Sequence, residues 1–400
     1  MTLTYPFPGP PAPGESLEIL PGIHWVRLPL PLKLDHVNVW VLEDGDGLTV
    51  VDTGVGDEGT RALWTGMAAG AGAAGGAGAD GAGAAGRAEA AARPARSALP
   101  RRPLTRILVT HHHPDHCGLA DRLSEEHGAE ILMSTLAHEA GLVLQRREKG
   151  TDARSTAARL AGHGLSPAAQ EFLVGNETSF EMLKPGLPPD FSPLAEGDTV
   201  PTGRYSWQVI FGQGHAPDHV CLYCADPPPG AAGGAGAPPG AGGAAAGGLG
   251  GAAPEKRPGV LISGDMVLPH ISTHVGSPAA WLPGNPVALF HQSVRRLAEL
   301  PADTLVLPSH GEPFVGLRER VAELEVHHEE RCRTIAGALG QPRSAAELLQ
   351  VVFQRELDPL QLMLAMNEAV AHLEYMTERG ELERLAGDDG ITRYVRRDAL

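Results

Sequence analysis

Cysteine is scarce in this chain of 400 residues, and the sequence shows neither a membrane-spanning run nor a signal-peptide pattern. Four cysteines are too few for a scaffold of disulfide bonds, and they fit a reducing compartment. No apolar run reaches the length of a membrane-spanning helix, and the proline-rich N-terminus lacks the basic start and apolar core of a signal peptide. We therefore expect a cytoplasmic protein without membrane contacts.

Positive charge is also in short supply. Lys and Arg together number 32 against 48 Asp and Glu, which gives a formal net charge of −16 at pH 7. This balance favours a small-molecule substrate and argues against broad attraction to nucleic acid, although it allows a local basic groove. The apolar content of 42 % is enough for a full core, and the length predicts two domains.

Two of the cysteines, Cys221 and Cys224, have C-x-x-C spacing. They lie within residues 220–225, a segment that predicts a strand, and positions three apart in a strand face opposite sides of the sheet. No second pair of cysteines stands nearby in the sequence. The spacing therefore favours a structural role over a redox or zinc site.

Chemistry-bearing side chains concentrate in residues 111–116, which hold four histidines and one aspartate. The aliphatic residues 106–110 before them predict a buried strand, and residues 117–123 after them predict a helix. His111 and His113 stand two apart, so a short extended segment can direct both imidazoles at one ion. A turn begun by the following proline could direct the next aspartate and histidine at a second ion. The segment predicts a metal site on a loop at a strand end, where α/β proteins usually hold ligands.

The same arrangement recurs further along the chain. Predicted strands over residues 207–211, 259–265 and 304–311 each end in, or shortly before, a metal-capable residue. Taken singly, such residues more often cap turns or form hydrogen bonds than bind metal. Together with the first cluster they complete seven candidate ligands, and one carboxylate can bridge two ions ~3.5–4 Å apart. One ion would take His111, His113 and His215, the other Asp115, His116 and His310, and the bridge would be Asp265.

The first part of the chain predicts a small meander. Residues 23–28, 37–42 and 48–51 predict three strands, with a hairpin turn between the last two. The third strand ends in Asp52, beside a glycine. By itself Asp52 is equally compatible with a turn cap and with a polar group that faces a site.

Two long stretches rich in Ala and Gly, at about residues 67–97 and 226–258, have no apolar stripe. Interspersed glycine costs ~1 kcal/mol per position in a helix, so neither stretch predicts regular structure. Because each lies between predicted strands, we expect both to be disordered surface insertions within one domain.

These motifs, in this order, resemble those of the metallo-β-lactamase-fold hydrolases over residues 15–315. The resemblance implies an α/β fold, an αββα sandwich with the metals at one edge, and it implies that Asp52 orients ligand histidines. The ligand set is similar to that of glyoxalase II and the ribonuclease Z group. The commonest antibiotic-degrading lactamases carry a cysteine at the position of Asp265, so β-lactam cleavage is not expected. The matching motifs are Asp52-Thr53-Gly54, His111-x-His113-x-Asp115-His116, His215, Asp265 and His310.

Residues 316–400 change to a helical pattern that ends in a predicted hairpin. This linker helix and tail resemble the winged-helix domain of the β-lactamase-like mitochondrial endoribonuclease and its bacterial relatives. Residues 343–400 nevertheless hold 11 carboxylates against 7 arginines, and we expect them to pack or to shape the substrate rather than to bind duplexes. The only basic spot is formed by Arg393, Arg396 and Arg397.

The resemblance implies a dinuclear metallo-hydrolase with two divalent ions, zinc first and iron or manganese as alternatives. A hydroxide bridging the ions would attack the substrate, and Asp115 could take up its proton. The substrate class implied first is a small ester or thioester, as for hydroxyacylglutathione hydrolase. The alternatives are cleavage of single-stranded RNA and a mononuclear-iron sulfur dioxygenase. As proton donor to the leaving group we favour His270 over His112, His219 and His274. The oligomeric state is left open.

Overall fold

The computed structural model describes residues 3–69, 99–146, 152–176, 184–228, 257–276, 284–353 and 355–399. Apart from a few residues at their ends, the insertions predicted at about residues 67–97 and 226–258 lie outside the described residues. Within the ranges described, no helix is both long and apolar enough to cross a bilayer.

Seven strands form the first sheet, and their order across the sheet follows the chain. They are β1 (Ser16–Leu20), β2 (Ile23–Pro29), β3 (His36–Asp44), β4 (Gly47–Val51), β5 (Leu104–Leu108), β6 (Glu130–Ser134) and β7 (Ser192–Leu194). The first four strands pair antiparallel, and β4 to β7 pair in parallel. Asp44 pairs with Gly47 across the turn between β3 and β4, which confirms the predicted hairpin.

Six strands form the second sheet. They are β8 (Thr199–Thr202), β9 (Tyr205–Gly212), β10 (His219–Cys224), β11 (Val260–Gly264), β12 (Leu305–Pro308) and β13 (Phe314–Val315). Their order is β13-β12-β11-β10-β9-β8, and only β11 and β12 pair in parallel. Because β9 and β11 both run antiparallel to β10, they point in the same direction.

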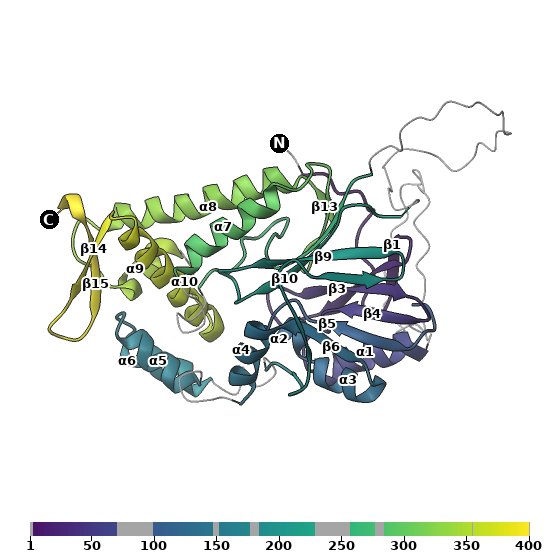
Figure 1. The fold of residues 1–400 in the computed structure, drawn as a ribbon. Helices are drawn as coiled ribbons and strands as arrows, with labels where there is room; N and C mark the ends of the chain where they lie inside the picture. Colours follow the sequence, from purple (N-terminus) through teal and green to yellow (C-terminus); the bar gives the residue numbers. More distant parts are fainter. Residues whose placement is uncertain are drawn as a thin grey trace, which may run out of the picture.

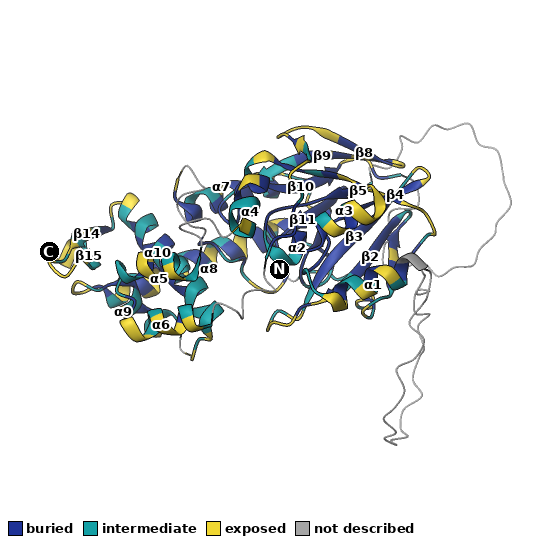
Figure 2. Cartoon of the chain, turned by 90° about the horizontal axis from the view of Figure 1, so that it is seen from below, coloured by how far each residue is buried: buried dark blue, intermediate teal, exposed yellow. Residues whose placement is uncertain are grey.

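The two sheets stack face to face, and helices cover both outer faces (Figure 1). Trp25 and Trp40 of the first sheet and Trp207 of the second lie in one buried cluster between the sheets. Strand alternation places neighbours such as Val26 and Val39 on the outer face instead. Figure 2 shows that the strands are largely buried and that exposed residues gather on the outer helices and turns. This layering confirms the predicted αββα sandwich.

Among the described residues, helices supply most of the outer layers of the sandwich. On the first sheet they are α1 (Glu58–Ala69), α3 (Ala120–His127) and α4 (Thr135–Arg146), and on the second α7 (Pro286–Ala298) and the first half of α8 (Leu317–Ala338). Cys221 packs among the helices over the second sheet, whereas Cys224 lies between the sheets. The expectation that these cysteines face opposite sides is confirmed, and all four cysteines are free and buried.

The helix α8 contributes to two apolar clusters. Leu317 and Leu324 in its first half pack over the second sheet, and Cys332 and Ile335 in its second half join a separate cluster. That cluster is built by α9 (Ala345–Val352), α10 (Pro359–Glu378) and the hairpin of β14 (Leu382–Ala386) and β15 (Thr392–Arg396). From the middle of the chain, α5 (Ala153–Ala161) and α6 (Pro167–Gly175) pack into the same cluster (Figure 1). The predicted helices and hairpin are therefore present, and the winged-helix form stays a prediction.

Candidate metal centre

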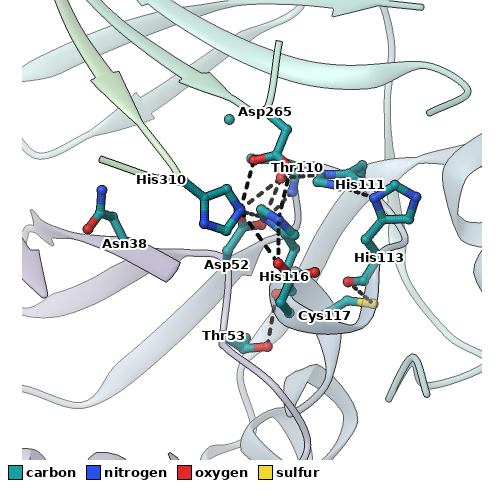
Figure 3. Close-up of polar contacts among 12 residues, drawn as sticks. Asn38, Asp52, Thr53, Thr110, His111, His113, His116, Cys117, Asp265 and His310 are labelled. Carbon is teal, nitrogen blue, oxygen red and sulfur yellow. Dashed lines mark hydrogen bonds and ion pairs between the residues drawn. The ribbon is translucent and has the colours of Figure 1, made fainter. Parts of the chain in front are cut away.

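The predicted ligands follow strand ends that meet at one edge of the sandwich. His111 follows β5, His215 follows β9, Asp265 follows β11 and His310 follows β12. In the second sheet β9, β11 and β12 point the same way, so their carboxyl ends lie at the same edge. The segment after β5 reaches that edge through the hydrogen bond from Val220 N to the carbonyl O of Thr110. Figure 3 shows His310, Asp265 and His116 pointing toward one another.

Three imidazoles form the first half of the centre. The Nε2 atom of His111 lies 2.9 Å from Nδ1 of His113 and 3.2 Å from Nε2 of His215. Burial, together with the charges of the surrounding histidines, holds the pKa of His111 and His113 well below the usual value. Both rings are therefore neutral, which is the form of histidine that binds metal.

The second half combines one carboxylate with two imidazoles. The short helix α2 (Pro114–Cys117), with its proline at the first position, turns the chain so that Asp115 and His116 face inward. Oδ2 of Asp115 lies 3.5 Å from Nε2 of both His116 and His310. Burial by itself raises the pKa of Asp115, but the charges of these two histidines hold it below its usual value. The carboxylate is therefore ionised.

Asp265 lies between the two halves. Its Oδ2 atom is 3.3 Å from Nε2 of His215 and 3.6 Å from Nε2 of His116, and its Oδ1 atom is 3.3 Å from Nε2 of His310. One carboxylate thus contacts both groups of ligand-type side chains, as the predicted bridge requires.

The donor set fits divalent metal. Nε2 of His116 and Oδ1 of Asp265 are buried and have no hydrogen-bond partner, whereas buried polar atoms are normally paired. Two nitrogens held by one tetrahedral zinc ion lie about 3.3 Å apart, close to the separations among His111, His113 and His215. Each half of the centre is a group of three donors within 4.8 Å of one another, as is the set of His111, His116 and Asp265. One cation in each half would give the unpaired atoms of His116 and Asp265 a partner.

Asp52 supports the centre from behind. Its Oδ2 atom accepts a hydrogen bond of 2.8 Å from Nδ1 of His116, and its Oδ1 atom accepts one of 2.8 Å from the backbone N–H of Thr110. A left-handed backbone, with φ of 66°, aims the carboxylate at these donors. The bond to Thr110 also corrects our strand boundary, because β5 ends at Leu108 rather than at residue 110. Beyond Leu108 the backbone pairs with Asp52 and with β10, through the bond from Val220 N to Thr110 O.

Two further ligand-type histidines are oriented by backbone carbonyls. Nδ1 of His215 lies 2.8 Å from the carbonyl O of His274, and Nδ1 of His310 lies 2.7 Å from that of His36. In both rings this leaves Nε2 for the centre. The side chain of His36 also accepts a hydrogen bond of 2.9 Å from Gly311 N, which fixes the turn after His310. Sequence reasoning missed both contacts, since any residue type can supply a backbone carbonyl.

The remaining histidines near the motifs have other surroundings. Nε2 of His219 accepts a hydrogen bond of 3.1 Å from Asp265 N, so this ring is occupied in holding the backbone. His112 is buried and packs against Gly141 of α4. His270 is exposed, and its Nδ1 lies 3.4 Å from the hydroxyl of Tyr5, a neighbour that the sequence did not indicate.

One more group of ligand-type side chains lies away from the centre, on β1, β2 and β3. It consists of Glu18, His24 and Glu43. His24 Nε2 lies 3.2 Å from Glu43, and Glu43 also pairs with Arg102 at 3.2 Å. Glu18 accepts a hydrogen bond of 2.8 Å from Gly22 N. Each member thus has a protein partner already, and the group is an ordinary ion-pair cluster.

Comparison with known proteins agrees with this geometry. Residues 32–228 match the family described as the metallo-beta-lactamase superfamily, and residues 332–397 match the family described as the metallo-beta-lactamase-like C-terminal domain. The fold and the His/Asp centre are those of this class of metal-binding α/β protein. The chain belongs to the metallo-beta-lactamase superfamily and carries a metallo-beta-lactamase-like C-terminal domain.

Solved structures similar to nearly the whole chain include two at 25 % identity or more. A beta-lactamase domain protein from Burkholderia ambifaria is 35 % identical, with a TM-score of 0.76 and 98 % of each chain covered. A metallo-beta-lactamase family protein from Thermus thermophilus is 25 % identical, with a TM-score of 0.67, over 95 % of this chain and 100 % of the other. The Bacillus subtilis (strain 168) protein named "Probable metallo-hydrolase YqjP" is 22 % identical over 88 % of this chain and 91 % of its own length.

Proposed function

We propose that this protein is a dinuclear metal-dependent hydrolase that acts on a small ester or thioester. The observation that carries the proposal is the position of Asp265, whose two oxygens face both halves of the centre. A carboxylate between two groups of imidazoles is what a pair of adjacent ions requires. The name of the Bacillus subtilis relative supports the same reaction class.

Under this proposal the two halves of the centre hold one ion each. Zinc is the first choice, with iron or manganese as alternatives, because mixed nitrogen and oxygen donors accept all three. Bound divalent ions of this kind act as Lewis acids and lower the pKa of water to about 7. The first ion would be held by His111, His113 and His215, the second by Asp115, His116 and His310, and both by Asp265.

The surrounding side chains orient the ligands and move protons. Asp52 fixes the ring of His116 through the bond to Nδ1. The side chain of Asp115 is 20 % exposed, against 9 % for Asp265 and 2 % for Asp52, so it is the carboxylate that solvent reaches. Asp115 is therefore our choice to accept a proton from attacking water. His270, exposed and paired with Tyr5, is our choice to donate a proton to the leaving group.

The charge around the C-terminal hairpin favours a small substrate over RNA. Arg393 pairs with Asp389 at 2.7 Å, Arg396 with Asp398 at 3.1 Å and Arg397 with Glu383 at 3.7 Å. These pairs neutralise the only basic spot that the sequence indicated, so little charge is left to attract phosphates. We keep the division into a catalytic part, residues 15–315, and a winged-helix-like part, residues 316–400, within this proposal. The separate apolar cluster of α9 and α10 supports that division.

A substrate panel tests the proposal. We expect the purified protein to hydrolyse at least one small thioester or ester, to lose this activity with a chelator and to regain it with zinc. His111→Ala is expected to be inactive on the same substrate. Cleavage of labelled RNA without esterase activity would replace our choice by the RNA alternative. One iron per chain and oxygen uptake with a sulfur substrate would replace it by the dioxygenase.

A further inference from the structure

Residues 273–276, here called the 273–276 loop, touch the candidate metal centre at two points. The carbonyl O of His274 lies 2.8 Å from Nδ1 of His215, and the hydroxyl of Thr273 donates a hydrogen bond to the carbonyl O of Asp265. The direction of His215 Nε2 therefore depends on where this loop lies.

The loop is itself held by the C-terminal helix α10. Nδ1 of His274 lies 3.7 Å from Oε2 of Glu368, whose side chain is 16 % exposed. The other oxygen of Glu368 lies 3.4 Å from Arg331 of α8. Burial raises the pKa of Glu368, but contacts with His274, His372 and Arg331 lower it to about 2, so the carboxylate is ionised at neutral pH.

Close backbone packing fixes the end of the same loop. A Cβ atom at Gly276 would lie 2.8 Å from Glu368 N and 2.9 Å from the carbonyl carbon of Asn367. Only glycine allows the loop to approach α10 this closely. The loop thus has two independent contacts with the helix, one between polar side chains and one through close backbone packing.

We propose that Glu368 is a positioning residue for the metal centre, acting through His274 on His215. The inference rests on the proposed metal centre, and it assigns to the C-terminal domain a role in metal binding. The chain of contacts runs from Arg331 and Glu368 to the 273–276 loop, and from the loop to one half of the centre. The half formed by Asp115, His116 and His310 has other supports, namely Asp52 and His36. Loss of Glu368 should therefore lower the affinity for one ion more than the affinity for the other.

The test compares variants of the full chain. Glu368→Ala removes the anchor, Glu368→Gln keeps its shape without the charge, and His274→Ala breaks the same contact from the other side while leaving the backbone carbonyl. The matched control is Glu374→Gln on the same helix, because Glu374 contacts Tyr394 and Arg384 of the hairpin and not the loop. Circular dichroism and thermal melting of the metal-free proteins establish that each variant folds.

Zinc affinity is measured by competition with a chromophoric chelator, and geometry by the visible spectrum of the Co²⁺-loaded protein. We expect Glu368→Ala and His274→Ala to lower the affinity for one zinc ion by about 10- to 100-fold. Both variants should also alter the absorption bands of the bound Co²⁺. Glu368→Gln should lie between these variants and the wild type, and Glu374→Gln should match the wild type. The double variant Glu368→Ala/His274→Ala should lose no more affinity than either single variant, since both break one contact.

Wild-type affinity and an unchanged Co²⁺ spectrum in folded Glu368→Ala would overturn the inference while leaving the proposed function intact. If Glu368→Ala does not fold, wild-type affinity and an unchanged Co²⁺ spectrum in both His274→Ala and Glu368→Gln would overturn the inference instead. A wild-type protein that binds neither zinc nor Co²⁺ would overturn the proposed function first, and the inference with it.

Discussion

Two groups of buried or half-buried histidines in this chain differ in what their ring nitrogens face. In the candidate metal centre, nitrogens from several strand ends converge on carboxylates, and one of those nitrogens, His116 Nε2, has no hydrogen-bond partner. In the second group, on α7, α8 and α10, neighbouring rings contact one another at interplanar angles between 26° and 77°. Ring nitrogens here also lack hydrogen-bond partners, but they do not converge in a set of three donors. The second group, here called the C-terminal histidine group, consists of His291, His327, His328 and His372.

The comparison shows that a cluster of several histidines is not by itself a metal site, because the ring nitrogens must also converge on one point. His328 and His372 lie with ring centroids 5.3 Å apart and share one hydrogen bond of 3.1 Å. Burial, with the charges of the neighbouring histidines, lowers the pKa of His328 to about 3. Within the described residues, no set of three converging donors includes a member of this group. Its rings act as packing groups, whereas those of the metal centre present lone pairs to one point.

The largest expected effect separates the two groups by function. Asp265→Ala should lower metal content and reduce hydrolysis by more than about 100-fold, beyond the range typical of residues that only orient ligands. His372→Gln, in the C-terminal histidine group, should keep metal and activity. Bound metal per chain and the initial rate on the substrate found by the panel check both variants. Metal loss in His372→Gln alone would reverse our assignment of the two groups.

Asp52→Asn should have the next largest effect. Asparagine tolerates the left-handed backbone of this position and keeps the side-chain shape, but it carries no charge to hold His116 Nδ1–H. We expect metal affinity to fall by about 10- to 100-fold. Competition with a chelator measures this fall. An affinity equal to that of the wild type would remove Asp52 from the supports of the centre.

The C-terminal histidine group should make stability depend on pH. The pKa of His328 is about 3 in the folded chain and near 6.5 in the unfolded one, so only the unfolded chain gains this proton as the pH falls below 6.5. The free energy of unfolding should therefore fall by about 2 kcal/mol between pH 6.5 and pH 5 on account of this residue. It should recover as the pH rises again.

Denaturant unfolding of metal-free protein at several pH values measures this dependence. Excess chelator removes any contribution from metal release, and His328→Gln should show a shallower loss of stability toward acid than the wild type. Parallel curves for the two proteins would contradict the assignment of this pH dependence to His328.

The smallest effect concerns the ion-pair cluster on the first sheet. His24→Gln removes the contact with Glu43, whose side chain is 29 % exposed, and such pairs contribute under about 1 kcal/mol. We expect unchanged metal content and only a slight shift of the melting temperature. A loss of one metal ion per chain in this variant would show that the cluster binds metal after all.

Sequence reasoning could reach the fold class and the identity of the converging side chains. Alternation and apolar runs indicated the long strands, and the order of the metal-capable residues indicated which of them meet. Short strands such as β7, Ser192–Leu194, carry too few residues for a pattern, and their pairing is decided by neighbours far along the chain.

The supports of the centre were harder to predict than its ligand-type residues. Asp52 stood at a strand end, but its partners Thr110 and His116 are set by a backbone turn that the apolar pattern of residues 106–110 concealed. The carbonyl groups of His36 and His274 have no signature in residue type. Glu368 lies 153 positions beyond His215, the difference of their residue numbers, and only tertiary packing relates the two.

The continuity of α8 ties the two apolar clusters into one mechanical unit. One continuous helix packs in both clusters. The C-terminal helices therefore cannot move away from the sandwich unless α8 bends or its first turns detach from the second sheet. In a fragment that ends in the middle of α8, Leu317 and Leu324 would lie on a short helix that frays at its new end. We expect such a fragment to aggregate, and the two parts of the intact protein to melt in a single transition.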